Sequence, residues 1–384
     1  MPFDFLVPPR IIVGEGALNE AVPVWKASGT RAPIVTDPSM VQLGHAAMLE
    51  ELLHKAGIPS STFADITGEP TDKMVEAGLE VWRRDGCDFL IGLGGGSALD
   101  TMKAIGALAT GGGNIADYMG RPITAPTPPM TAIPTTAGTG SEATQFTIIN
   151  DTKKDVKMLL KGTVLIPQLA VVDPRFTLSV PPKITASTGL DAFTHAAEAY
   201  TSRRANSLSD TFALSAIKRI VKYLPAAYQN GSDVKAREEM AIGALEAGIA
   251  FNNASVTVVH GMSRPIGALF HVPHGTSNAM LDEACFAYVL DGNYKKFGDL
   301  ARAVGAARPE DEDEAAARKF LDVVRSLCET CHIPTLAEYG IDKEQFFARM
   351  DKMADDALES GSPANTAKEL TKADILAIYR SLWT

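Results

Sequence analysis

Hydrophobic and polar positions follow two different patterns along the chain. Up to about residue 180, short apolar runs alternate with stretches in which apolar residues recur at helical spacing. This alternation is typical of parallel strands joined by crossover helices. The apolar runs are APIVTD (32–37), DFLIGL (88–93), MTAIP (130–134) and LAVVD (169–173). Residues 1–180 are therefore predicted to form an α/β domain built on a mostly parallel sheet.

The pattern changes after Pro181 and Pro182. Segments rich in Ala, Leu, Met and Glu, with apolar residues at helical spacing, continue from there to the end of the chain. In the last of them, Thr371 followed by Asp374 is a capping-box signature ahead of an apolar helix face. Residues 181–384 are therefore predicted to form a second, all-helical domain.

Composition and charge narrow the class of protein. A chain of 384 residues with 46% hydrophobic content can bury the cores of two domains, and its net charge of −10, with no Lys/Arg-rich run, argues against nucleic acid and anionic membranes as partners. The uncharged stretch 122–141 is too rich in Pro, Thr and Gly to span a bilayer as a helix. Four cysteines make no disulfide framework, and the N-terminus lacks the features of a signal peptide, so we expect a cytoplasmic protein. The single CxxC pair, Cys328 and Cys331, is interpreted as a coincidence near a helix end.

A glycine turn follows the apolar run 88–93. Gly94, Gly95 and Gly96 lead to Ser97, which is expected at a helix N-cap, with Asp100 three residues later. Glycines allow a ligand to approach the backbone closely, and the free amides of a helix N-terminus favour an anion such as a pyrophosphate. The alternative is a tight turn with a capping box, since GLGGGS does not fit the GxGxxG dinucleotide fingerprint.

A second polar loop, PTTAGTGSEAT (134–144), follows the run 130–134 and carries hydroxyls that can donate to phosphates or to a nicotinamide amide. The hydroxyls singled out are those of Thr135, Thr136 and Thr139. Ligands of open α/β sheets bind outside the carboxyl ends of the strands, so two such loops favour a nucleotide. Asp37, which ends the run 32–37, could accept hydrogen bonds from an adenosine ribose and repel a 2′-phosphate, or could simply be a turn aspartate ahead of Pro38.

Asp191 and His195 are four residues apart in a helix candidate, 184–202, and therefore share one face. His260 and His274 follow in an apolar, glycine-containing segment. An exposed i,i+4 pair and two satisfied core histidines are the alternatives to a metal site. Three imidazoles and one carboxylate suit Fe(II), Zn, Mn or Ni better than Ca or Mg. Glu198, one turn beyond His195, is either a partner that fixes an imidazole tautomer or a surface glutamate.

At this point the motifs match a known family. The chain closely resembles the iron-containing, or group III, alcohol dehydrogenases nearly end to end, through GGGSALDTMKAIG, PTTAGTGSEAT with a later VKM, TGLDAFTHAAEAYTS and VHGMSRPIGALFHVPHG. The resemblance implies the dehydroquinate synthase-like fold, with NAD(P) and a metal in a cleft between two domains. Residues 1–180 would be a Rossmann-like, dinucleotide-binding α/β domain, and residues 181–384 an all-helical domain that binds the metal and carries catalysis. It implies Fe²⁺ held by Asp191, His195, His260 and His274, with Zn²⁺, Mn²⁺ or Ni²⁺ as alternatives. The implied cofactor contacts are Asp37, Gly95, Gly96, Ser97, Asp100, Thr135, Thr136, Thr139 and Lys157.

The sequence also departs from the family pattern. Many members have a proton-relay histidine in a VHxxxHP motif, whereas this chain reads VHGMSRP and has Arg264 there. Where many members read NAxLLPHV, this chain reads NAMLDEACF, with Asp282 and Glu283 in place of Leu-Pro. An NPT-like segment appears as GEPT (68–71), which puts one cofactor contact in doubt.

The resulting functional prediction is a metal-dependent, NAD(H)-preferring oxidoreductase that interconverts a small primary alcohol, or hydroxy acid, and its aldehyde or ketone. Because Arg264 cannot transfer a proton near neutral pH, relay is expected through water, a cofactor ribose or His271. We hypothesise that Arg264 attracts an anionic end of the substrate; the alternative is an ion pair with Asp282 or Glu283. An apolar wall is expected to include Phe146 and Phe251.

Alternatives within the superfamily are a glycerol-dehydrogenase-like enzyme and a dehydroquinate-synthase-like lyase that returns its NAD unchanged. A non-catalytic NAD- or metal-binding protein is the alternative from another class. The resemblance suggests a homodimer or larger assembly, and a small-molecule alcohol or aldehyde as the partner.

Overall fold

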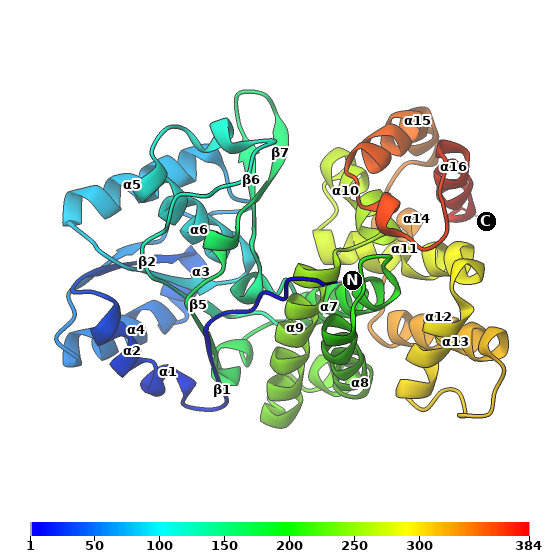
Figure 1. Ribbon diagram of the computed structural model, residues 1–384, viewed down its shortest axis with the longest axis horizontal. Helices are drawn as coiled ribbons and strands as arrows, with labels where there is room; N and C mark the ends of the chain where they lie inside the picture. The colour runs from blue at the N-terminus through cyan, green and yellow to red at the C-terminus, as the bar shows by residue number, and fades with distance from the viewer. Residues whose placement is uncertain (1, 384) are drawn as a thin grey trace. The chain divides into compact units, whose positions relative to one another are not determined.

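The computed structural model describes residues 2–383, which form two compact units (Figure 1). One unit is Leu6–Ser179 and contains the strands. The other contains residues 180–383 together with residues 2–5, where the ring of Phe5 stacks on that of Phe212 at a centroid distance of 5.8 Å.

The first unit is built on a six-stranded sheet in which all neighbouring strands are parallel. Its strands, in spatial order, are β1 (Arg10–Val13), β8 (Leu169–Val172), β5 (Met130–Pro134), β4 (Leu90–Gly94), β2 (Ala32–Thr36) and β3 (Ser60–Phe63). The chain runs from β2 outward to β3, returns to β4, and then proceeds outward in the opposite direction through β5 and β8. The strand order therefore reverses between β2 and β4, which is where open α/β sheets bind ligands.

Helices cover both faces of this sheet, so its central strands are buried on both sides and read as continuous apolar runs. The helices are α1 (Ala17–Glu20), α2 (Val22–Ser28), α3 (Pro38–Gln42), α4 (His45–Lys55), α5 (Asp72–Asp85) and α6 (Gly96–Gly111). Successive residues of β4 enter opposite cores: Leu90 packs in the cluster that contains α5 and α6, and Ile91 in the cluster that contains α2 and α4. The predicted Rossmann-like α/β architecture is confirmed.

A two-stranded antiparallel hairpin lies outside the main sheet. It consists of β6 (Phe146–Asp151) and β7 (Val156–Lys161). The sequence analysis named neither these strands nor β1 and β3. β1 and β3 are the edge strands of the main sheet, and β3, Ser-Ser-Thr-Phe, has only one strongly apolar residue.

The second unit is helical, and among its described residues β pairing is limited to one isolated bridge, between Ser202 and Thr366. Its helices are α7 (Pro182–Thr201), α8 (Ser207–Gln229), α9 (Val234–Ala254), α10 (Val258–Phe270), α11 (His274–Val289), α12 (Tyr294–Ala303), α13 (Asp313–Thr330), α14 (Leu336–Tyr339), α15 (Lys343–Glu359) and α16 (Lys372–Ser381). The all-helical prediction is confirmed. So is the capping box: Thr371 and Asp374 bond reciprocally at the start of α16.

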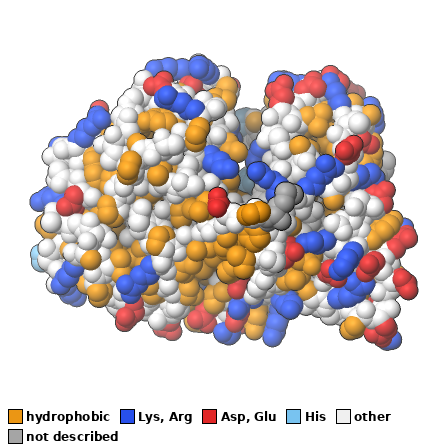
Figure 2. Space-filling model, in the orientation of Figure 1, with side chains coloured by type: hydrophobic (Ala, Val, Ile, Leu, Met, Phe, Trp, Pro, Cys, Tyr) orange, Lys and Arg blue, Asp and Glu red, His pale blue; other side chains and the backbone are white. Residues whose placement is uncertain are grey.

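No single helix within residues 2–383 is long and apolar enough to cross a bilayer; only the sharply bent pair α9 and α10 reaches that composition together. On the face drawn in Figure 2, basic and acidic side chains of the helical unit are mixed.

All four cysteines are free thiols, and Cys328 and Cys331 lie at the end of α13.

Candidate metal centre and nucleotide site

Helix α7 provides two of the predicted metal ligands. Pro181 and Pro182 begin the helix without a backbone donor, and nothing interrupts it up to Thr201. Asp191 and His195 are one turn apart on the same face and are 3% and 5% exposed. His195 Nε2 lies 3.9 Å from Asp191 Oδ1, so the two side chains converge as the spacing predicts.

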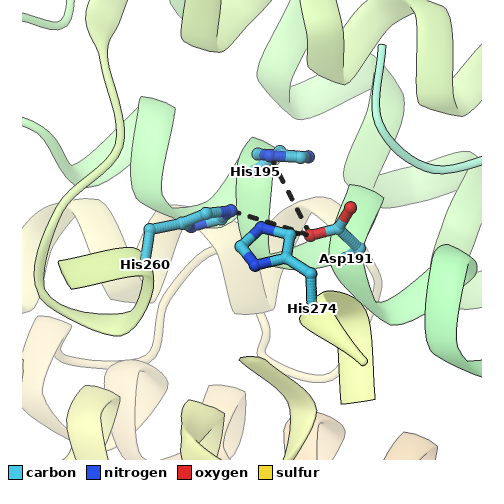
Figure 3. Close-up of side chains that lie close together, drawn as sticks. All are labelled: Asp191, His195, His260 and His274. Atoms are coloured by element: carbon cyan, nitrogen blue, oxygen red, sulfur yellow. Dashed lines mark ion pairs between the residues drawn. The ribbon is translucent and has the colours of Figure 1, made fainter. Parts of the chain in front are cut away.

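The other two histidines lie on either side of a sharp reversal. His260 lies in the first turn of α10, and His274 is the first residue of α11. His271 ends α10 in the left-handed region, with φ of 54°, which allows the chain to turn back within three residues. The Nε2 atoms of His260 and His274 each lie 3.6 Å from Asp191 Oδ1. Figure 3 shows the three imidazoles directed at one carboxylate oxygen.

Gly275 allows α11 to approach α7 closely enough for this convergence. A Cβ atom on Gly275 would lie 2.2 Å from the backbone oxygen of Ser187 and 3.0 Å from the Cβ of Asp191. Any side chain at this position would therefore push the start of α11 away from the helix that carries Asp191 and His195.

Glu198 is fully buried and supports the His260 ring from behind. Its carboxylate lies 2.6 Å from His260 Nδ1 and accepts hydrogen bonds from the amides of Thr257 and Val259 and from the Thr257 hydroxyl. A carboxylate at Nδ1 places the proton there and leaves the lone pair of Nε2 directed towards Asp191. The interpretation of Glu198 as a partner that fixes an imidazole is the one the geometry bears out, and the imidazole is that of His260.

Electrostatics in the cluster reflect its burial and its opposite charges. Burial opposes ionisation of Asp191, but the neighbouring imidazoles hold its pKa well below the usual range. Burial likewise disfavours the charged form of His260, yet its hydrogen bonds to Asp191 and Glu198 raise the pKa overall to about 9.

The four groups fit a transition-metal ion. Each offers one ligand atom, three nitrogens and one oxygen, and these atoms lie within 4.8 Å of one another. A set of imidazoles with one carboxylate suits Fe(II), Zn, Mn or Ni.

Two further side chains complete the centre, and sequence reasoning did not fully anticipate them. Asn278 Nδ2 donates to Asp191 Oδ1 at 2.8 Å. Because Asn278 lies four residues after His274, helical spacing could have identified it. The ring of Phe251, which was predicted as part of an apolar wall, stacks on His195 at a centroid distance of 4.2 Å and an interplanar angle of 17°.

In the α/β unit, the predicted phosphate site lies at the start of α6. The helix begins at Gly96 with Gly95 as N-cap and has no side-chain cap, so the expected N-cap position of Ser97 is wrong, and so is the alternative of a capping box with Asp100. Ser97 lies inside the first turn. The uncapped amides of this turn remain free for an anion, which favours the phosphate interpretation over the tight-turn alternative.

Several predicted cofactor residues meet around these glycines. A Cβ on Gly96 would lie 2.8 Å from Thr139 Cγ2, one on Gly95 would lie 3.5 Å from Thr136 Oγ1, and one on Gly94 would lie 3.1 Å from Asp37 Oδ2. The loops after β2, β4 and β5 therefore converge at the strand-order reversal. Because Gly94 and Gly96 carry no side chain, these loops can pack this closely at the strand ends, and we call the junction of the three glycines with Thr136, Thr139 and Asp37 the glycine cradle.

Other residues of the predicted nucleotide site have partners within the protein. Asp37 caps α3 by accepting from the amides of Ser39 and Met40 through Oδ1, as the turn alternative expected. Asp100 is buried and accepts from the Ile148 amide, and Lys157 pairs with Glu69 at 2.6 Å. Thr135 is buried, and its amide donates to the Gly94 carbonyl.

Comparison with known proteins assigns the chain. A model of the family described as iron-containing alcohol dehydrogenase matches residues 8–174, and a model of the Fe-containing alcohol dehydrogenase family, C-terminal, matches residues 185–383. The chain belongs to the iron-containing alcohol dehydrogenase family. As a member, it is an oxidoreductase of the alcohol dehydrogenase type with its own metal centre.

Relatives of this iron-containing alcohol dehydrogenase match it over nearly its whole length. NAD-dependent methanol dehydrogenase of Bacillus methanolicus is 34% identical, covering 98% of this chain and 99% of the relative. The crystal structure of a 1,3-propanediol oxidoreductase superposes with a TM-score of 0.96 at 35% identity, covering both chains fully. Sulfoacetaldehyde reductase from Bifidobacterium kashiwanohense, in complex with NAD+, gives a TM-score of 0.90 at 30% identity, covering 100% of this chain and 99% of that one.

The residues that depart from the family motif lie in two helices of this iron-containing alcohol dehydrogenase: Arg264 in α10, and Asp282 and Glu283 in α11. Arg264 pairs with neither Asp282 nor Glu283, so that alternative is wrong: Asp282 is fully buried against the Thr194 hydroxyl, and Glu283 pairs with Arg325. The Arg264 guanidinium donates instead to Ser362 Oγ at 3.2 Å.

The predicted relay residue, His271, is exposed, and its backbone carbonyl accepts from the hydroxyl of Tyr339. No hydrogen bond or ion pair within residues 2–383 joins its imidazole to the four metal ligands.

Proposed function

We propose that this chain interconverts a short primary alcohol, or hydroxy acid, and its aldehyde or ketone, with NAD(H) preferred over NADP(H) and Fe²⁺ as the resident metal. The observation that carries the proposal is the convergence of the buried Asp191, His195 and His260 with the partly exposed His274, backed by Glu198. This cluster lies in the same chain as a glycine cradle with an uncapped helix N-terminus.

A divalent metal bound by these four residues supplies a Lewis acid for the substrate oxygen, while hydride transfer belongs to the nicotinamide. The protein residues orient and insulate the centre. Glu198 holds His260 in the tautomer with Nε2 free, Asn278 directs an N–H to Asp191 Oδ1, and Phe251 covers one face of His195. Burial of the cluster excludes water and strengthens each of these interactions.

A proton must also reach or leave the substrate oxygen. Arg264 remains charged near neutral pH and cannot transfer it. We propose relay through water or a cofactor ribose hydroxyl, with His271 as the side-chain candidate. The exposure of His271 supports exchange with solvent, and a His271→Ala enzyme whose pH–rate profile matches that of the wild type would remove it from the relay.

The preference for NAD rests on Asp37. Its Oδ1 is committed to α3, but its Oδ2 lies beside Gly94 at the strand-order reversal. A carboxylate there would repel a 2′-phosphate and accept from ribose hydroxyls. We propose Ser97, Asp100, Thr135, Thr136, Thr139 and Lys157, with Gly95 and Gly96, as the remaining contributors to the cofactor site.

The assembly and location are also proposals. β1 lies at the sheet edge, and among the described residues no strand pairs with its outer side, which supports self-association into a homodimer or larger assembly. Light scattering coupled to size-exclusion chromatography measures the mass of the particle and so tests whether the chain forms a homodimer or a larger assembly. Four free thiols support a reducing, cytoplasmic location.

The substrates named for the relatives, methanol, 1,3-propanediol and sulfoacetaldehyde, are all short but differ in charge. The test is NADH oxidation with a panel of short aldehydes, using chelated protein before and after anaerobic reloading with Fe(II), Zn(II), Mn(II) or Ni(II). We expect turnover only after reloading. Bound NAD without net turnover under any loading would contradict the proposal and favour a lyase or a non-catalytic binding protein.

A further inference from the structure

Within residues 2–383, no carboxylate forms an ion pair with the positive charge of Arg264. It is only partly exposed, and its one hydrogen bond within the described residues is to the neutral hydroxyl of Ser362. Charges withdrawn from water are normally paired with an opposite charge. We therefore expect the guanidinium of Arg264 to bind an anion that is not part of the chain.

The carboxylates around Arg264 are already committed. Both oxygens of Glu198 are used by Thr257, Val259 and His260. The remaining acids of this region have their own partners: Asp191 has the imidazoles and Asn278, Asp282 has Thr194, and Glu283 has Arg325. Burial disfavours the charge on Arg264 and lowers its pKa, with Glu198 opposing the shift through space rather than by contact.

The position of Arg264 relates it to the metal ligands. It lies four residues after His260 on α10, so the two side chains share a face with about 6 Å between their Cβ atoms. Helical side chains lean towards the N-terminus of their helix, which directs the guanidinium back towards the turn that carries His260.

Ser362 is held beside this turn by a close approach of two backbones. A Cβ on Gly261 would lie 2.7 Å from the ring of Pro363, so the glycine lets the segment around Ser362 pack directly on α10. Ser362 is 5% exposed. Because its oxygen accepts from Arg264, its own proton is left to donate to a ligand, and Arg264 and Ser362 together present several donors side by side.

We propose that Arg264 and Ser362 bind an anionic oxyacid group, a carboxylate or a sulfonate, at the far end of a short substrate whose reacting oxygen lies at the metal centre. This inference rests on the proposed function and specifies its substrate class. The planar fork of arginine matches two oxyacid oxygens at once, and its position one helical turn from His260 places it beside the metal ligands. In this chain the position of the usual relay histidine serves substrate recognition.

The test compares aldehydes matched in length, with the metal-loaded enzyme and NADH. The pairs are succinic semialdehyde with butanal for the carboxylate, and sulfoacetaldehyde with propanal for the sulfonate. We expect wild type to favour at least one anionic member by about tenfold or more in kcat/KM. Arg264→Gln should lower that anionic-to-neutral ratio by about 10- to 100-fold, mainly through KM, and Arg264→Lys and Ser362→Ala by less.

Arg325→Gln, which removes a half-exposed arginine paired with Glu283, is the control and should leave both rates unchanged.

A second readout is calorimetric titration of unreactive succinate and ethanesulfonate into metal- and NAD+-loaded enzyme, where Arg264→Gln should weaken binding by at least about tenfold. This titration also decides the inference if no aldehyde is reduced and the proposed function fails. Equal kcat/KM for anionic and neutral members in wild type, or an unchanged ratio in Arg264→Gln together with unchanged binding, would overturn the inference and leave the dehydrogenase proposal standing.

Discussion

At the residue scale, the feature that most constrains the metal centre is a carboxylate that does not itself face the metal. Glu198 accepts four hydrogen bonds, from Thr257, Val259 and His260, and so fixes both the ring orientation of His260 and the start of α10. Outer partners of this kind typically contribute 10- to 100-fold to metal affinity.

Glu198→Gln should therefore weaken metal binding by about 10- to 100-fold, because the glutamine amide would present N–H groups to donors that need an acceptor. Competition with a chromogenic chelator measures this affinity. Glu314→Gln, which removes an exposed partner of Arg318, is the matched control. Equal metal affinity in Glu198→Gln and wild type would contradict this role.

The metal-free protein should lose stability as pH rises. The pKa of His260, about 9 against an ordinary 6.5, is raised in the folded state, so protonation stabilises the fold fully below pH 6.5 and this contribution disappears as pH rises through about 9. Thermal unfolding of chelated wild type should show Tm falling over this window more steeply than that of chelated His260→Ala. Metal keeps the imidazole neutral, so the gain in Tm on metal loading should widen with pH. Parallel profiles for the two chelated proteins would refute the assignment.

Spacing and residue chemistry, which are local properties, made Asp191, His195, His260 and His274 candidates, and the resemblance to the family identified them as one set of ligands. It left Glu198 undecided between two readings, since a glutamate one turn past a ligand looks the same whether buried or exposed. The partner of Arg264 was wrongly expected among Asp282 and Glu283. Both acids are nearby in sequence, but the packing of α11 turns one towards Thr194 and the other towards Arg325.

At the scale of elements, the approach of α11 to α7 decides whether the ligands meet. Gly275→Ala should destabilise the protein by about 1–3 kcal/mol and weaken metal binding, because the added methyl would meet the Ser187 carbonyl oxygen. Urea unfolding and metal titration measure the two effects. Gly68→Ala, where nothing lies within 4 Å of the added atom, is the control and should behave as wild type. If the two alanine variants bind metal equally well, the close approach is not required.

Lys103 ties α6 to the second cofactor loop. Its fully buried ammonium donates to the carbonyls of Thr144 and Phe146 and to the Thr144 hydroxyl. Lys103→Met should cost about 2–4 kcal/mol, because two buried carbonyls lose their donor, and it should weaken NAD binding as the loop loosens. Denaturant unfolding measures the change in stability, and NAD titration measures the change in affinity. The exposed Lys73→Met serves as control, and undiminished NAD affinity in Lys103→Met would contradict a role in ordering the loop.

Most elements could be read from the sequence because the central strands and the long helices have strong periodicity. The strands that the sequence did not predict are β1 and β3 at the sheet edges and the β6–β7 hairpin. These strands are partly exposed, so they lack the continuous apolar runs of the central strands. The start of α6 was misplaced by two residues, because Gly95, rather than Ser97, is the N-cap. That difference matters, since an uncapped start leaves the amides free for phosphate.

At the scale of the whole molecule, the proposed chemistry is divided between the two units. The α/β unit provides the glycine cradle at its strand-order reversal, and the helical unit provides the metal ligands. The central claim is that a single metal ion held by Asp191, His195, His260 and His274 is required for NAD(H)-linked turnover by this chain.

The most direct test is to titrate Fe(II) anaerobically into chelated enzyme while recording NADH-dependent reduction of an aldehyde that the enzyme accepts. The account predicts that activity rises from zero to a break at one metal per chain, and that His260→Ala, still folded by circular dichroism, shows neither tight binding nor turnover. Turnover by the fully chelated enzyme, or an unchanged titration in His260→Ala, would contradict it.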